Sequence, residues 1–213
     1  MPGTTAFRTF LVPKQIIFGR GSVQSLEKIQ GQRAVIFTDK TMVHLGAAER
    51  VEKYLQKSGV TSRVYAEVEP EFAFSSIETM VKQNQDFNPD IVIGLGGGSV
   101  LDAAKAFRVY YEHPELGVKD IFPLAGPPRR PIPPLSKTIF IAIPTTSGTG
   151  SDVSPAFVVS DPETKDKRAT GSPFLIADRT ILDPDFTDSL PRTLQIDSGF
   201  DALSHAVAAY YSK

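Results

Sequence analysis

Two potential metal ligands, Asp201 and His205, lie four residues apart near the end of the sequence. The stretch FDALSHAVAAYYSK around them has the pattern of a helix, and residues four apart lie on one helical face. The carboxylate and the imidazole could therefore reach the same metal ion, and this pair of donors suits Fe²⁺, Zn²⁺ or Mn²⁺. A catalytic site normally takes at least three ligands from the protein. The pair indicates half of a metal site.

A glycine-rich turn follows a strand-like run and precedes a helix-like one, in the sequence GLGGGSVLDAAK. Glycines allow backbone N–H groups to approach a ligand closely. The amino end of a helix adds unpaired N–H donors and a partial positive charge. This combination predicts a cradle for an anion such as a pyrophosphate. The spacing, Gly94-x-Gly96-Gly97-Gly98-Ser99, differs from the usual G-x-G-x-x-G, and a tight turn without a ligand is the alternative.

Two further polar groups follow strand-like runs. Asp39 ends AVIFTD, where an acid is well placed to accept hydrogen bonds from an adenosine ribose and to repel a 2′-phosphate, which favours NAD over NADP. It could equally be the N-cap of the next turn. IPTTSGTGSD places the hydroxyls of Thr145, Thr146, Ser147 and Thr149 in a loop broken by glycine. They could donate hydrogen bonds to a phosphate or a carboxamide, or simply stabilise the loop.

Strands and helices are expected to alternate along most of the chain. Ser22 is the expected N-cap of the first helix, and Ser75 with Glu78 has the spacing of a capping box. This alternation predicts an α/β fold with a parallel sheet covered by helices on both faces. The carboxyl ends of parallel strands share one edge, so the three polar loops should meet there. Strands are expected at residues 9–13, 14–19, 33–39, 62–68, 90–96, 138–146, 155–161 and 179–184.

The pattern changes after Pro184, where the sequence becomes helical throughout. We therefore expect an α/β domain over residues 1–184 and the beginning of a helical domain over residues 185–213. The proline-rich stretch 112–136 is expected to be a surface excursion. Helical residues 190–203 include several apolar side chains that should be exposed: Leu190, Leu194, Phe200 and Leu203.

The overall composition is that of an ordinary globular protein. The net charge of -1 does not favour nucleic acid or an anionic membrane as a partner. There are no cysteines, which excludes disulfides and thiolate ligands and fits the reducing cytosol. Neither a signal peptide nor a membrane span is indicated. We therefore expect a cytoplasmic protein.

Four motifs occur in a familiar order: GGGSVLDAAK, IPTTSGTGSDVSP, ILDP and FDALSHA. From about residue 8 to its end the chain resembles the iron-containing (group III) alcohol dehydrogenases. This resemblance implies a dinucleotide-binding domain followed by an all-helical, metal-binding domain, and hydride transfer between a small alcohol or aldehyde and NAD. The positions that match cofactor-contacting residues of the family are Asp39, Gly97, Gly98, Ser99, Thr145, Thr146, Thr149, Lys167 and Leu182.

The resemblance also gives some of these residues individual roles. Lys167 matches a lysine near the cofactor ribose, and Leu182 matches a residue on the nicotinamide side. Asp201 and His205 match two of the family's four metal ligands, whose metal would be Fe²⁺, or Zn²⁺ or Mn²⁺ in its place. The other two ligands are histidines further along the helical domain, and neither His44 nor His113 matches them.

The sequence is therefore expected to be an N-terminal portion of such an enzyme, inactive by itself. A homodimer, or self-association through the exposed C-terminal helix, is expected. Two alternatives remain open at this point. One is a non-catalytic nucleotide-binding or interaction domain that retains the fold, and the other is a zinc enzyme of the glycerol dehydrogenase type. The sequence identifies neither the substrate nor a catalytic residue.

Overall fold

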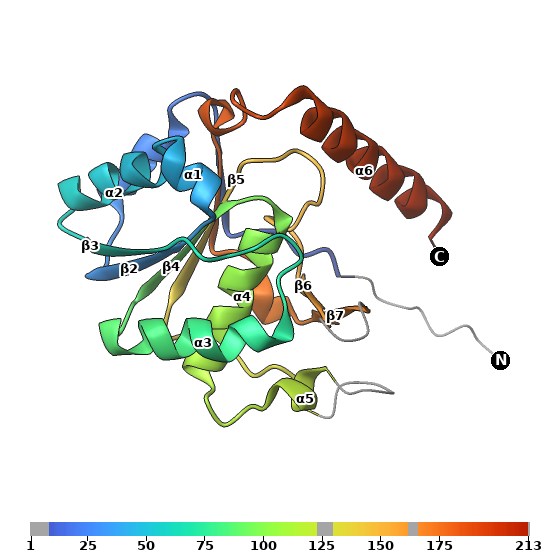
Figure 1. The fold of residues 1–213 in the computed structure, drawn as a ribbon, viewed down its shortest axis with the longest axis horizontal. Coiled ribbons are helices and arrows are strands. Elements are labelled where there is room, and N and C mark those ends of the chain that lie inside the picture. Colours follow the sequence, from blue (N-terminus) through green and yellow to red (C-terminus); the bar gives the residue numbers. More distant parts are fainter. Residues whose placement is uncertain (1–8, 123–129, 162–165, 213) are drawn as a thin grey trace.

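A six-stranded parallel sheet forms the centre of the computed structural model, which describes residues 9–122, 130–161 and 166–212. The strand order is β1-β8-β5-β4-β2-β3. Every neighbouring pair is parallel. This arrangement confirms the predicted α/β class (Figure 1). The strands are β1 (Gln15–Phe18), β2 (Arg33–Phe37), β3 (Thr61–Tyr65), β4 (Ile91–Gly96), β5 (Ile139–Pro144) and β8 (Arg179–Leu182).

Successive side chains of a strand point to opposite faces of the sheet. Different helices cover these two faces, so the side chains of one strand belong to two hydrophobic clusters. Ala34 and Ile36 of β2 pack in the same hydrophobic cluster as residues of η1 (Ser22–Lys28) and α2 (Ala47–Lys57). Val35 and Phe37 pack in a second cluster with α3 (Phe74–Asn84) and α4 (Gly98–Glu112). Figure 1 shows the two helical layers on opposite sides of the strands. The remaining short helices of this unit are α1 (Lys40–His44), η2 (Gln85–Phe87), η3 (Pro173–Leu175) and η4 (Pro184–Phe186).

Both predicted serine caps are wrong. The N-cap of η1 is Gly21, with a φ of 77° that glycine adopts readily. A distant carboxylate, that of Asp183, accepts hydrogen bonds from the amides of Gly21 and Val23 at 3.0 and 3.1 Å. Helix α3 begins one residue before Ser75 and has no side-chain cap. At η1 a contact from a residue distant in the sequence therefore replaces the local cap.

Two strand predictions also need correction. Residues 9–13 do not form a strand. The stretch at 155–161 forms β6 (Ala156–Ser160), which pairs with the unpredicted β7 (Lys167–Gly171) in a separate antiparallel sheet. The strand expected at 179–184 is confirmed as β8, which lies between β1 and β5. The proline-rich stretch contains a short helix, α5 (Val118–Ile121), while residues 123–129 within it lie outside the described part.

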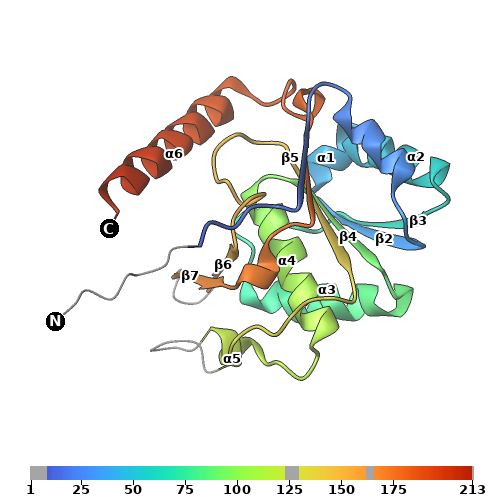
Figure 2. The same ribbon diagram turned by 180° about the vertical axis from the view of Figure 1, so that it is seen from behind.

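Helix α6 (Arg192–Tyr211) runs outward from the sheet and has no buried residues (Figure 2). Three of the four apolar residues expected to be exposed are so, namely Leu194, Phe200 and Leu203. Leu190 is half-buried, because it precedes the helix and faces a cavity. Within the described residues, no helix is long and apolar enough to cross a membrane.

Candidate functional site

The order of the strands creates a natural place for a ligand beside β2. The chain passes from β2 to β3 on one side of it and then to β4 on the other. In open α/β sheets, ligands bind at the carboxyl ends of the strands where the order reverses in this way. Asp39 follows β2 and Gly97 follows β4, so the predicted acid and glycine turn lie on the two sides of this point.

A cavity of about 860 Å³, here called the rim cavity, opens along this edge of the sheet. Its volume is in the upper part of the range for small-molecule and cofactor sites. Six of the nine predicted cofactor residues line it: Asp39, Gly97, Gly98, Ser99, Thr145 and Thr146. The expectation that three polar loops meet at one edge is therefore confirmed. Further lining residues that the sequence did not reveal are Lys40, Glu67, Glu69, Pro70, Phe186, Leu190, Pro191 and Leu194.

The glycine turn brings the start of α4 unusually close to its neighbours. Gly97 is the N-cap of α4, and the first N–H groups of a helix have no partner within it. A Cβ atom added at Gly98 would lie 2.8 Å from Cγ2 of Thr149, and one at Gly96 would lie 2.6 Å from Cγ2 of Val100. Both positions therefore require glycine for packing. Gly97, Gly98 and Ser99 also line the rim cavity, so the start of α4 lies where an anion could bind.

Asp39 has the N-cap role that the sequence left open, and it also lies at the cavity. Its Oδ1 accepts a hydrogen bond from the amide of Met42 at 2.9 Å, which caps α1. The residue also lines the rim cavity. Within the described part of the chain, Oδ2 has no hydrogen-bond partner, so one oxygen remains for a ligand hydroxyl. Next to it, Lys40 pairs with Glu67 across the rim at 3.0 Å.

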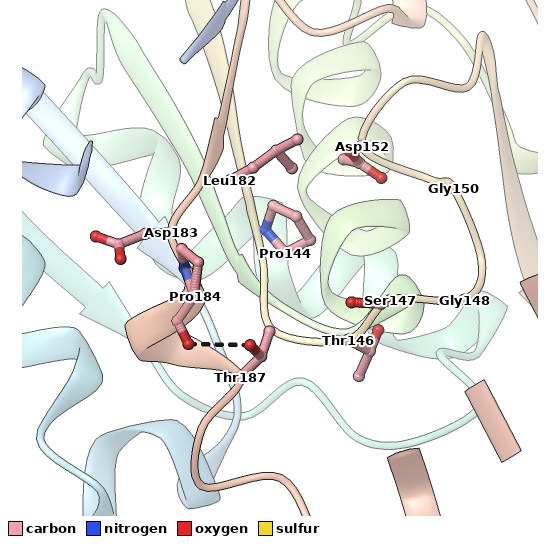
Figure 3. A pocket seen from close by; sticks show the side chains of 10 residues that line it. All are labelled: Pro144, Thr146, Ser147, Gly148, Gly150, Asp152, Leu182, Asp183, Pro184 and Thr187. Carbon is pink, nitrogen blue, oxygen red and sulfur yellow. Dashed lines mark hydrogen bonds between the residues drawn. The ribbon is translucent and has the colours of Figure 1, made fainter. Parts of the chain in front are cut away.

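The loop after β5 separates the rim cavity from a smaller one. This second space, here called the side cavity, has a volume of about 380 Å³. Figure 3 shows it between the loop after β5 and the segment after β8, where Thr187 Oγ1 donates to the Pro184 carbonyl at 2.9 Å. Thr146 lines both cavities. Leu182, Ser147 and Asp152 line the side cavity, where burial raises the pKa of Asp152.

Thr149 and Lys167 lie outside the linings of both cavities. Thr149 packs directly on Gly98, so it supports the glycine turn from behind. Lys167 is in β7 and pairs with Glu71 at 3.2 Å, with both side chains exposed. Because Glu69 and Pro70 line the rim cavity, this ion pair lies just beyond its edge. The structure thus brings seven of the nine predicted cofactor residues to the two cavities.

The two predicted metal ligands do lie together. On α6, Nε2 of His205 is 3.4 Å from Oδ1 of Asp201, and both side chains are substantially exposed. Within the described residues, no group of three or more His, Asp or Glu side chains could hold a metal ion. The residues present therefore do not fit a catalytic metal centre, although two of its donors have the right spacing.

Sequence reasoning missed a buried polar cluster formed by Asp102, Lys105 and Ser151. Lys105 Nζ lies 3.0 Å from Ser151 Oγ, which in turn donates to Asp102 at 2.5 Å. Burial lowers the pKa of Lys105 to about 8 and raises the pKa of Asp102. The signal in the sequence was a lysine among apolar helix residues, in DAAKAF. A solvated lysine would more often have polar neighbours.

Comparisons with known proteins agree with this picture. The family model for iron-containing alcohol dehydrogenases matches residues 13–184. Aldehyde-alcohol dehydrogenase of Streptococcus pneumoniae is 36% identical over 95% of this chain and 24% of its own length. NADPH-dependent butanol dehydrogenase of Clostridium saccharobutylicum is 34% identical over 94% of this chain and 51% of its own.

A solved structure shows the same similarity. That of an iron-containing alcohol dehydrogenase from Thermococcus thioreducens has a TM-score of 0.88 and 33% identity, over 96% of this chain and 54% of that one. The chain thus spans between about a quarter and about half of the length of these relatives. The region matched by the family model includes the whole parallel sheet and all seven predicted cofactor residues that line the two cavities. This chain belongs to the iron-containing alcohol dehydrogenase family.

Proposed function

We propose that this chain supplies the NAD-binding part of an alcohol dehydrogenase that transfers hydride between a small alcohol or aldehyde and nicotinamide. The observation that carries the proposal is the rim cavity. It joins an acid with a free oxygen, a glycine turn at the start of a helix, and a loop of hydroxyls at the point where the strand order reverses. The acid complements a ribose, the glycine turn complements a diphosphate, and the hydroxyls complement the carboxamide of a nicotinamide.

The positions of the groups suggest how NAD would lie. Asp39 would accept hydrogen bonds from the adenosine ribose, and the amides of Gly98 and Ser99 would face the diphosphate. Thr146 borders both cavities, so the nicotinamide end would pass it into the side cavity and meet Leu182. Lys167 would lie near a ribose at the outer edge. When bound, NAD supplies the hydride chemistry, and these residues bind it, orient it and restrict its access to water.

The choice between NAD and NADP is proposed from Asp39 alone. A carboxylate at this position would repel a 2′-phosphate. Membership of the family does not decide the matter, since the relative from Clostridium saccharobutylicum is described as NADPH-dependent. We propose NAD as the cofactor of this chain.

Residues 1–184 are proposed as the cofactor domain and residues 185–213 as the start of a metal-binding helical domain. Asp201 and His205 would be two ligands of the family's metal, with iron as the first choice and zinc or manganese as alternatives. Two exposed donors do not make a catalytic centre. We therefore expect the 213-residue chain to bind cofactor but not to turn over alcohol. The second candidate function is a nucleotide-binding domain that catalyses no reaction. It is favoured by the same observation, that Asp201 and His205 are only two of the ligands that a catalytic metal needs.

The test is calorimetric titration of NAD and NADP into the chain and into its Asp39→Gly variant. We expect NAD to bind more tightly than NADP to the original chain. The ratio of the NADP dissociation constant to the NAD dissociation constant should be at least tenfold smaller in the variant. Tighter binding of NADP to the original chain would refute the assignment of Asp39. A lack of binding of either dinucleotide would refute the proposed function.

A further inference from the structure

A buried lysine joins α4 to residues 151–156, which follow the loop of hydroxyls. Lys105 lies in α4, whose amino end forms the glycine turn, and its Nζ meets four acceptors on residues 151–156. The distances are 2.6 Å to the Ser151 carbonyl, 3.0 Å to Ser151 Oγ, 3.1 Å to the Ser154 carbonyl and 2.7 Å to the Ala156 carbonyl. Hydrogen bonds from an ammonium group are stronger than neutral ones. The side chain therefore fixes the end of the loop that carries the hydroxyls.

Asp102, one helical turn earlier, holds the same segment. Its Oδ1 accepts from Ser151 Oγ at 2.5 Å, and its Oδ2 accepts from the amide of Val158 at 3.0 Å. Lys105 Nζ lies 4.0 Å from Asp102, so the two side chains share Ser151 as their common partner. All three residues are buried. Together they join α4 to residues 151–158 at both ends of that segment.

The consequence for the cavity follows from where this segment leads. The hydroxyl loop starts at Thr145, whose amide donates to the Gly96 carbonyl at 3.0 Å, and it ends at Ser151. Between these anchors, Thr149 packs on Gly98 of the turn. Release of Ser151 would break the hydrogen bonds between the loop and α4, and would leave the loop held at Thr145 and by the 2.9 Å hydrogen bond from Thr180 Oγ1 to the Asp152 carbonyl. Thr146 and Thr149 would then be held less firmly relative to the amides of the glycine turn.

We propose that Lys105 is a positioning residue for cofactor binding, which, with Asp102 and Ser151, holds the hydroxyl loop against the amino end of α4. The proposal rests on the proposed function, because it concerns the shape of the same cavity. Lys105 itself touches no cofactor position. Its effect on binding passes through residues 145–151.

The balance between a closed and an open loop depends on the protonation of the lysine. A neutral amine keeps two N–H donors for its four acceptors on the loop and no longer carries a charge that burial disfavours. Charged groups facing Lys105 are Asp102 on its own helix and Asp152 on the loop, and β6 presents none. Because burial lowers the pKa of Lys105 to about 8 in the closed loop, a loop that opened to water would hold the proton of Lys105 more tightly. Raising the pH from 7 to 9.5 should therefore favour the closed loop, and NAD affinity should rise over the same range.

The experiment compares Lys105→Met with Arg108→Met. Arg108 is a matched control, because it is also buried in α4 but binds the Leu135 and Thr138 carbonyls at the opposite end of the sheet. NAD affinity is measured by calorimetry at pH 7.0 and pH 9.5. The amide hydrogen exchange of residues 145–156 is measured without cofactor, as protection factors that correct for pH.

We expect both variants to melt at a lower temperature, but only Lys105→Met to bind NAD about tenfold more weakly at pH 7.0. The original chain and Arg108→Met should gain affinity severalfold at pH 9.5, whereas Lys105→Met should show no such step. Protection of residues 145–156 should fall in Lys105→Met and stay unchanged in Arg108→Met.

Unchanged protection and affinity in Lys105→Met, or an equal loss in both variants, would overturn the inference. If Lys105→Met does not fold, Ser151→Ala, which removes only the shared hydroxyl, should reduce both protection and affinity. Unchanged values there would also overturn it. A chain that binds no NAD at either pH would refute the proposed function instead, and the exchange measurements would still decide the role of Lys105.

Discussion

Gly98→Ala is the substitution whose effect the structure specifies most closely. The added methyl carbon would lie 2.8 Å from Cγ2, 3.0 Å from Oγ1 and 3.1 Å from Cβ of Thr149. Such overpacking costs about 1–3 kcal/mol when the neighbours must move. Thr149 belongs to the hydroxyl loop, so its displacement should also weaken NAD binding by about tenfold for each 1.4 kcal/mol lost there.

The neighbouring glycine provides the control. A methyl carbon at Gly97 would lie 3.5 Å from its nearest neighbour, an ordinary contact, so Gly97→Ala should cost less than about 1 kcal/mol, mainly at the helix cap. Thr149→Ser removes the methyl group that makes the 2.8 Å contact. The double variant Gly98→Ala, Thr149→Ser should therefore recover at least half of the stability lost by Gly98→Ala.

Stability would be measured by urea unfolding, and NAD affinity by calorimetry on the same samples. Equal stability of the two alanine variants would show that the close packing of Gly98 on Thr149 is not present in solution. A double variant no more stable than Gly98→Ala would show that the clash involves some other atom. Either result would refute the account of the glycine turn.

Four further outcomes follow from the contacts already described. Gly148→Ala places a methyl carbon 2.7 Å from a backbone oxygen of α6, so hydrogen exchange in that helix should accelerate. Asp183→Ala should lower the free energy of unfolding by about 2–3 kcal/mol in urea, because it leaves buried amides unpaired. With the pKa of Lys105 lowered from 10.5 to about 8, the unfolded chain holds more protons between these values. The free energy of unfolding should therefore rise with pH there, by at most about 3 kcal/mol, but not in Lys105→Met. Asp201→Asn and His205→Gln should leave NAD affinity and the melting temperature unchanged, with or without added Fe²⁺ or Zn²⁺, because both side chains are exposed on α6.

The sequence was sufficient to predict the sheet and the meeting of Asp39, Gly97 and Thr145. Each of these residues ends or follows an apolar strand, and parallel strands place such residues on one edge. The position of β8 between β1 and β5 could not be predicted, since its pairing joins residues 15–18 and 179–182. Strand β7 was missed because KRATG lacks an apolar run and forms only by pairing with β6.

The parts of the site that sequence reasoning missed depend on contacts between distant segments. Glu67 and Leu194 both line the rim cavity, although they are more than a hundred residues apart in the sequence. The role of Lys105 likewise depends on Ser151, whose position is set by the turn of the loop after β5. The predicted cap at Ser22 was wrong for the same reason. The carboxylate of Asp183, distant in the sequence, accepts the hydrogen bonds from the amides at the start of that helix. Local patterns specified the elements, and long-range packing specified which of their residues meet.

The central claim is that the diphosphate of NAD binds the amides at the start of α4. A crystal structure of this chain soaked with NAD tests it most directly. We predict density for the diphosphate within hydrogen-bond distance of the amide nitrogens of Gly98 and Ser99, with the adenosine ribose at Asp39. A dinucleotide bound elsewhere on the chain, or an empty rim cavity at saturating NAD, would contradict the claim.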